Sequence, residues 1–207
     1  MNRRNEKCLL IEGSSGNLEV AVNEPSAPSV GCALIAHPHP LYGGTFENKV
    51  VQTLAKAFCA LGLTAVRFNF RGVGNSDGVY GGGAGEIEDF ETVLSYAEQR
   101  FQPNHLIFAG FSFGTYVVAR VAQDNSPHQV VLIAPAVGKF EVESVPEDSL
   151  VLHGEEDDVV LLSDVLNWAR PQHIPVTVFP GAGHFFHGDL IRLQNVVINH
   201  CRQKLSS

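Results

Sequence analysis

The sequence has little positive charge and no long apolar run, and both shortages exclude classes of protein. Its 207 residues contain 14 Lys and Arg against 22 Asp and Glu, which gives a formal net charge of −8. Nucleic-acid binding needs a basic face, so we expect no nucleic-acid partner and no polybasic membrane anchor. No apolar run approaches the roughly 20 residues that span a bilayer, so we expect no membrane span.

Cysteine is also scarce, with four scattered residues that form no C-x-x-C pair. This spacing is typical of buried or incidental thiols rather than of a disulfide framework or a zinc site. Two arginines near the start could open a signal peptide, but no apolar core follows them before the turn at residues 13–16. The sequence therefore predicts a cytoplasmic protein.

Strand and helix patterns alternate along the chain, which predicts a single α/β domain over residues 1–207. Because parallel strands need crossover connections, the alternation predicts a mostly parallel sheet of about eight strands with helices on both faces. An antiparallel hairpin is expected at one edge. The expected strands are 7–12, 17–22, 31–36, 63–70, 105–111, 129–134, 150–153 and 175–179, and the expected helices are 48–61, 87–100, 115–123, 161–169 and 189–204.

A G-x-S-x-G motif stands between an expected strand and an expected helix, reading Gly110-Phe111-Ser112-Phe113-Gly114. In this context the serine occupies a sharp, strained turn with its hydroxyl exposed, and a side chain at either glycine would collide with the neighbouring strand or helix. The helix directs its positive end toward the serine, where an oxyanion would form. The motif therefore predicts Ser112 as a nucleophile, against the alternative of a plain turn.

A serine nucleophile needs a base, and the base needs a carboxylate that orients it. The loops after two later strands supply both, with Asp157 and Asp158 in one and His184 and His187 in the other. Parallel strands end at the same edge of the sheet, so the three loops can meet. The order serine, acid, histidine is that of one hydrolase fold. The residues alone do not decide between Asp157 and Asp158 as the acid, or between His184 and His187 as the base.

Together these residues resemble the α/β-hydrolase superfamily over nearly the full chain. Within it, the chain is similar to small bacterial hydrolases that carry His-Pro-His-Pro-x-x-Gly-Gly after the third strand, here residues 37–44. Residues 71–78 resemble the R-G-x-G-x-S-x-G turn of many members. On this resemblance Asp157 is the expected acid rather than Asp158, and His184 the expected base rather than His187.

The resemblance also implies an oxyanion hole with two backbone donors. One is the N–H of Phe113, directly after the nucleophile. The other lies in residues 37–44, where the two prolines have no N–H to donate. His39, Leu41 and Tyr42 remain, and Leu41 is the preferred candidate.

The expected activity is hydrolysis of an ester or thioester of a small acyl substrate through an acyl-enzyme on Ser112, with no cofactor. Activity should fall when the base His184 becomes protonated at low pH. The stretch over residues 135–149 is too short for a multi-helix lid, which predicts an open site. The sequence carries no signal for an oligomeric state.

Three alternatives stay open at this stage. The same three residues would serve an acyltransferase or a peptidase, and the fold can carry a non-catalytic binding module. A metal-dependent hydrolase is disfavoured, because the Asp and His that an H-x-H-x-D-H motif needs are missing after His39. A second serine, Ser76, lies in a Ser-Asp-Gly turn and is expected to be structural.

Overall fold

The computed structural model describes residues 6–205 of the chain. The strands are β1 (Glu6–Gly13), β2 (Gly16–Asn23), β3 (Gly31–Ala36), β4 (Leu63–Phe68), β5 (Leu106–Phe111), β6 (Gln129–Ile133), β7 (Leu150–Gly154) and β8 (Val176–Phe179). The helices are α1 (Lys49–Ala60), α2 (Ala84–Phe101), α3 (Phe113–Asp124), α4 (Leu162–Ala169) and α5 (Leu190–Leu205). The two N-terminal arginines, and both ends of the expected domain, lie outside the described residues.

The described strands form one sheet in the order β1-β2-β4-β3-β5-β6-β7-β8. The β1–β2 and β2–β4 pairs are antiparallel, and all the other pairs are parallel. The prediction of a mostly parallel sheet with a hairpin at one edge is therefore confirmed.

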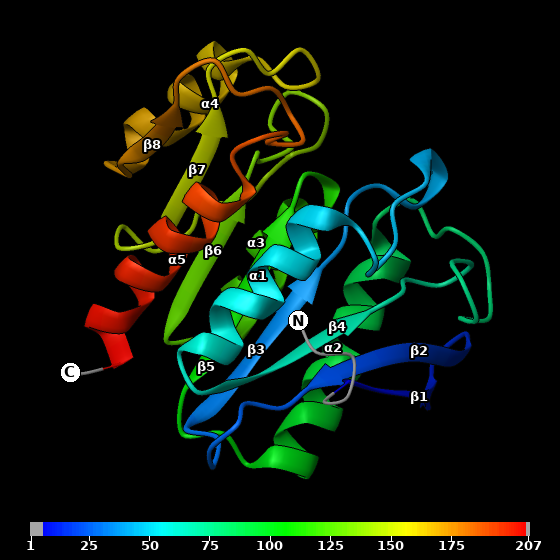
Figure 1. Cartoon of the computed structure of the whole chain (residues 1–207). Helices are drawn as coiled ribbons and strands as arrows, with labels where there is room; N and C mark the ends of the chain where they lie inside the picture. Colours follow the sequence, from blue (N-terminus) through cyan, green and yellow to red (C-terminus); the bar gives the residue numbers. More distant parts are fainter. Residues whose placement is uncertain (1–5, 206–207) are drawn as a thin grey trace.

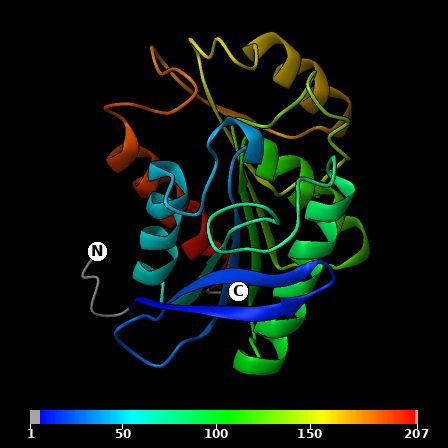
Figure 2. The same ribbon diagram turned by 90° about the vertical axis from the view of Figure 1, so that its right-hand side faces the viewer.

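Helices cover both faces of the sheet (Figures 1 and 2). Buried residues of α1 and α5 pack on one face, and those of α2, α3 and α4 pack on the other. Every residue of β3 and β4 is buried, as expected for strands covered on both sides. Most helices connect parallel strands, so the loops after β3, β5, β7 and β8 all emerge at the carboxyl edge of the sheet.

The connection from β6 to β7 contains no helix. Residues 134–149 have only one isolated bridge, between Val137 and Phe140. No lid covers the carboxyl edge at this point, as the sequence predicts. Among the described helices, none is long and apolar enough to cross a membrane. All four cysteines are unpaired, which agrees with their spacing.

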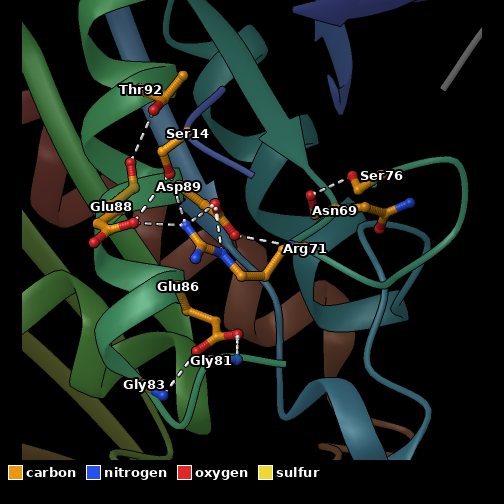
Figure 3. A network of polar contacts seen from close by, with 10 residues as sticks. All are labelled: Ser14, Asn69, Arg71, Ser76, Gly81, Gly83, Glu86, Glu88, Asp89 and Thr92. Atoms are coloured by element: carbon orange, nitrogen blue, oxygen red, sulfur yellow. Dashed lines mark hydrogen bonds and ion pairs between the residues drawn. The ribbon is translucent and has the colours of Figure 1, made fainter. Parts of the chain in front are cut away.

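Most elements differ from their expected bounds by one to three residues, and two of these differences have a clear physical cause. Helix α2 begins three residues before the expected Ile87, because the Glu86 carboxylate accepts the N–H groups of Gly81 and Gly83 and fixes the first turn (Figure 3). Strand β4 ends two residues before the expected Phe70, because the Phe70 N–H leaves the ladder and donates to a histidine ring nitrogen.

A buried ion pair holds the glycine-rich loop after β4 (Figure 3). Both the backbone N–H and the guanidinium of Arg71 donate to the Asp89 carboxylate of α2, at 2.8–3.0 Å. The same guanidinium reaches Ser14 in the β1–β2 turn. Ser76 lies in this loop, and its hydroxyl donates to the Asn69 carbonyl oxygen. The structural role expected for Ser76 is therefore what the structure shows.

Removing the cation of this pair should leave the buried Asp89 carboxylate with a backbone N–H but no opposite charge. We expect Arg71→Met to lower the free energy of unfolding by about 3 kcal/mol, measured by urea denaturation. Arg120→Met removes a cation from an exposed pair with Asp124 and serves as the control, with no measurable loss. Equal effects of the two substitutions would contradict the structural role given to the buried pair.

Candidate active site

Ser112 occupies a strained turn between β5 and α3. Its backbone has φ 53° and ψ −119°, a region that residues with a side chain rarely adopt. The Ser112 N–H donates to the Ile133 carbonyl oxygen at 2.9 Å, which fixes the turn against β6. A Cβ at Gly110 would overlap the backbone of Gly114, and a Cβ at Gly114 would overlap the carbonyl oxygen of Ala36. The steric reason expected for both glycines is confirmed.

The loops after β7 and β8 bring an acid and a histidine to this serine. The Nε2 atom of His184 lies 3.0 Å from Ser112 Oγ, and its Nδ1 atom lies 2.7 Å from Asp157 Oδ2. His184 and Asp157 are buried, whereas the competing Asp158 and His187 are exposed. The structure therefore joins the preferred residues in one hydrogen-bonded chain that ends at a partly exposed hydroxyl.

Asp157 is held ionised by its surroundings. Its Oδ1 accepts the N–H groups of Val159 and Val160 at 2.9 and 2.8 Å. Burial alone would raise the pKa of Asp157, but the hydrogen bonds from His184 and Val160 outweigh it and keep the pKa below its usual value. A carboxylate in this state can orient the imidazole and stabilise its protonated form.

His153 is a neighbour of the acid that no sequence motif marks. Its ring is fully buried, and its Nε2 lies 2.9 Å from the Val160 carbonyl oxygen and 3.6 Å from Asp157 Oδ2. Burial lowers the pKa of His153, which favours a neutral ring under the acid. The only signal in the sequence is its position near the end of β7, four residues before Asp157 in the loop that follows.

The backbone amides of the loop after β3 bear on the choice of the second oxyanion donor. The N–H of Leu41 donates to His39 Nδ1 at 3.2 Å, and that of Tyr42 donates to the His39 carbonyl oxygen at 3.1 Å. Both amides already have local acceptors, which argues against the preferred Leu41. The amides of His39 and Phe113 have no acceptor among residues 6–205. Phe113 is the first residue of α3, where no intrahelical acceptor exists.

A buried histidine holds the loop that carries His39. The Nε2 atom of His37 accepts the Phe70 N–H at 3.1 Å, so Nδ1 carries the proton and donates to the Pro38 carbonyl oxygen at 2.6 Å. Burial lowers the pKa of His37 to about 4, so the ring is neutral near pH 7. The ring thereby ties the loop after β3 to the loop after β4.

A cavity of about 410 Å³ opens beside Ser112. Aromatic rings supply much of its wall, and the His39 ring packs against three of them at centroid distances of 4.7–5.8 Å. The Nε2 atom of His39 lies 3.3 Å from the Tyr80 hydroxyl, so both nitrogens of the His39 ring have hydrogen-bond partners. Of the aromatic residues that flank the motifs, Phe111 and Phe186 are core residues and Phe185 is exposed. The rings in the cavity wall are those of His39, Tyr42, Phe113 and Phe140.

The histidines do not gather into a metal site. Among residues 6–205, no group of three or more His, Cys, Asp or Glu side chains is placed to hold a metal ion.

Comparison with known proteins finds a matching family model, a related sequence and solved structures of the same fold. A family model described as serine aminopeptidase, S33, matches residues 42–147. An uncharacterized protein of Rickettsia prowazekii (strain Madrid E) is 31% identical, over 86% of this chain and 81% of its own length. A crystal structure from Xanthomonas campestris, described as an a/b serine hydrolase without lid, has a TM-score of 0.93 at 35% identity and covers 98% of this chain and 96% of that chain. A structure described as an alpha-beta serine hydrolase homologue, from Coxiella burnetii, has a TM-score of 0.85 at 41% identity and covers 93% and 96%.

The lowered pKa of His37 should make stability depend on pH. The unfolded chain binds a proton near pH 6.5 and the folded chain only near pH 4, so the free energy of unfolding should fall as the pH drops through this window. The contribution of His37 is roughly 3 kcal/mol. Urea denaturation between pH 7 and pH 4 should show a weaker pH dependence in His37→Gln than in the wild type. The exposed His187→Gln variant is the control and should keep the wild-type dependence.

Proposed function

The chain belongs to the α/β serine hydrolase family, and from that premise we propose that it cleaves small carboxylic esters or thioesters through an acyl-enzyme on Ser112. One observation carries the proposal: the imidazole of His184 bridges Ser112 Oγ and the Asp157 carboxylate at 3.0 and 2.7 Å. Both distances lie within the range needed for direct proton transfer and orientation.

The reaction follows from this geometry. Ser112 Oγ attacks the carbonyl carbon while His184 Nε2 accepts the hydroxyl proton, and the protonated ring then delivers that proton to the leaving alcohol or thiol. Water then attacks the acyl carbon and gives a proton to His184 Nε2. The bond between the acyl carbon and Ser112 Oγ breaks, His184 returns the proton to Oγ, and the carboxylic acid leaves. Asp157 stays ionised, holds the proton on Nδ1 and stabilises the imidazolium.

The oxyanion needs two donors, and we assign them to the amides of Phe113 and His39. Both amides lack acceptors among the described residues, and both residues line the cavity beside Ser112. A donor without a protein acceptor is available to the developing negative charge. The local acceptors of Leu41 and Tyr42 make those two amides poorer candidates.

A peptidase is the second candidate, since the matched family model is described as a serine aminopeptidase. An aminopeptidase must bind a free α-ammonium group, for which a carboxylate is the usual partner. The cavity wall holds no carboxylate and one lysine. A lysine ammonium in the wall would repel the α-ammonium group of a peptide. The cavity therefore favours ester or thioester cleavage over removal of N-terminal residues.

Loss of the nucleophile should abolish both labelling and turnover. We expect a fluorophosphonate to add once to the wild type and not to Ser112→Ala, measured by intact mass. Hydrolysis of 4-nitrophenyl acetate should fall by about 10⁴-fold or more in kcat/KM. Ser95→Ala, at an exposed position of α2, is the control and should behave as wild type. A folded wild type that neither labels nor cleaves esters or dipeptide amides would point to a binding module.

The amide of His39 can be tested by comparing two substitutions. His39→Ala removes the ring, and His39→Pro removes the ring together with the N–H. The φ of −52° at His39 suits proline, so the second variant should keep the backbone. We expect kcat of His39→Pro to lie about 10²- to 10³-fold below that of His39→Ala. Equal kcat values in two variants of equal thermal stability would remove His39 from the oxyanion hole.

A further inference from the structure

The cavity beside Ser112 combines apolar walls with one charge. Aromatic rings and the aliphatic side chains of Ala136, Val159 and Val160 line it, and its volume of about 410 Å³ lies in the range of small-molecule sites. The one charged side chain in the wall is Lys139, and no Asp or Glu lines the cavity. The charge of the cavity wall is therefore positive, whereas the net charge of the whole chain is −8.

Lys139 has no partner that accounts for its position. Its ammonium group makes no hydrogen bond or ion pair with any side chain or backbone group in residues 6–205. Arg71, Arg120 and Lys204 are paired with carboxylates. Lys56, however, is unpaired within the described residues as Lys139 is, so the distinguishing feature of Lys139 is its place in the wall of the cavity that holds Ser112. An unpaired cation on an acidic protein, at the wall of the cavity that holds Ser112, is free to bind an anion from solution.

The backbone around Lys139 is fixed to the turn that carries Ser112. Thr115 of α3 donates its hydroxyl proton to the Ser112 carbonyl oxygen at 2.6 Å, and its oxygen accepts the Ala136 N–H at 3.0 Å. The Ala136 carbonyl oxygen in turn accepts the N–H groups of Lys139 and Phe140. One chain of hydrogen bonds therefore links the nucleophile to the lysine.

Aromatic packing also holds the same segment against α3. The Phe140 ring lies 5.0 Å from that of Phe113 and 5.2 Å from that of Tyr116, measured between centroids. The 136–140 turn is thus held against α3 by both polar and apolar contacts. Lys139 consequently stands at a set position relative to Ser112, even though its own side chain is exposed and can adjust to a ligand.

We propose that the substrate group occupying this cavity is apolar along its length and carries a carboxylate or phosphate that pairs with Lys139. The inference rests on the proposed function and narrows it to monoesters or thioesters with an anionic end. The apolar part of the substrate packs against the aromatic and aliphatic walls, and the anion meets the ammonium at the rim.

Pairs of esters that differ only in charge test this assignment. 4-Nitrophenyl hexanoate and mono-4-nitrophenyl adipate differ by a terminal carboxylate on the acyl side, and phenyl acetate and 3-carboxyphenyl acetate differ by one on the leaving group. The quantity measured is the ratio of kcat/KM for the anionic ester to that for its neutral partner. Rates of Ser112→Ala are subtracted to remove spontaneous hydrolysis.

In at least one pair the ratio should fall by about three- to tenfold in Lys139→Gln and further in Lys139→Glu. The pair that responds identifies which side of the ester occupies the cavity, and a matched phosphate ester then ranks carboxylate against phosphate. Lys56→Gln on α1 removes the same charge away from the cavity and should keep the wild-type ratio. Ratios unchanged in both pairs overturn the assignment.

A binding readout separates this inference from the proposed function. Calorimetric titration of Ser112→Ala with benzoate and with benzamide compares an anion with a neutral ligand of similar shape, and it requires no turnover. The Lys139→Gln substitution in that background should weaken benzoate binding and leave benzamide binding unchanged. Charge-dependent binding without ester cleavage would reject the proposed hydrolysis and support the anion site at Lys139. Ester cleavage without charge dependence would support the hydrolysis and reject the anion site.

Discussion

The strained turn at Ser112 is the constraint on which the rest of the site depends. A residue with a side chain at φ 53° costs about 1–3 kcal/mol, so surrounding contacts must hold it there. The Ser112 N–H bonds to β6, and its carbonyl oxygen accepts bonds from the N–H and the hydroxyl of Thr115. These contacts turn the chain abruptly from β5 into α3. The hydroxyl consequently stands clear of the sheet edge, with the free amide of Phe113 beside it.

The same turn sets the position of both neighbouring loops. Gly114 has no side chain, and its Cα therefore approaches the carbonyl oxygens of Ala36 and His37, where the loop with the His39 amide begins. On the other side, the Thr115 hydroxyl accepts the Ala136 N–H and holds the segment that carries Lys139. A single change of chain direction thus places Ser112, the two amides proposed as oxyanion donors and one wall of the cavity. Sequence changes at Gly114 or Thr115 would move several of these parts together.

The sequence predicts those features that depend on local pattern. Apolar periodicity gives the order of strands and helices, and the motifs place Ser112, Asp157 and His184 at one edge because parallel strands share that edge. Sequence patterns do not predict which acceptor a given N–H group bonds when several acceptors lie within reach. The Leu41 amide is an available donor by sequence, yet the ring of His39 occupies it. His153 contacts Asp157 only because the loop after β7 folds back over its own strand, which no spacing rule reveals.

Three buried histidines in this small region have two different roles, and their hydrogen-bond partners distinguish them. Burial lowers the pKa of His37 and also that of His153, where it outweighs the nearby Asp157 carboxylate, so both rings act as neutral hydrogen-bonding groups. His184 instead has its Nδ1 on the ionised Asp157 and its Nε2 on a partly exposed hydroxyl. The difference between these rings is therefore one of partners: His184 alone among the three joins a carboxylate to the Ser112 hydroxyl.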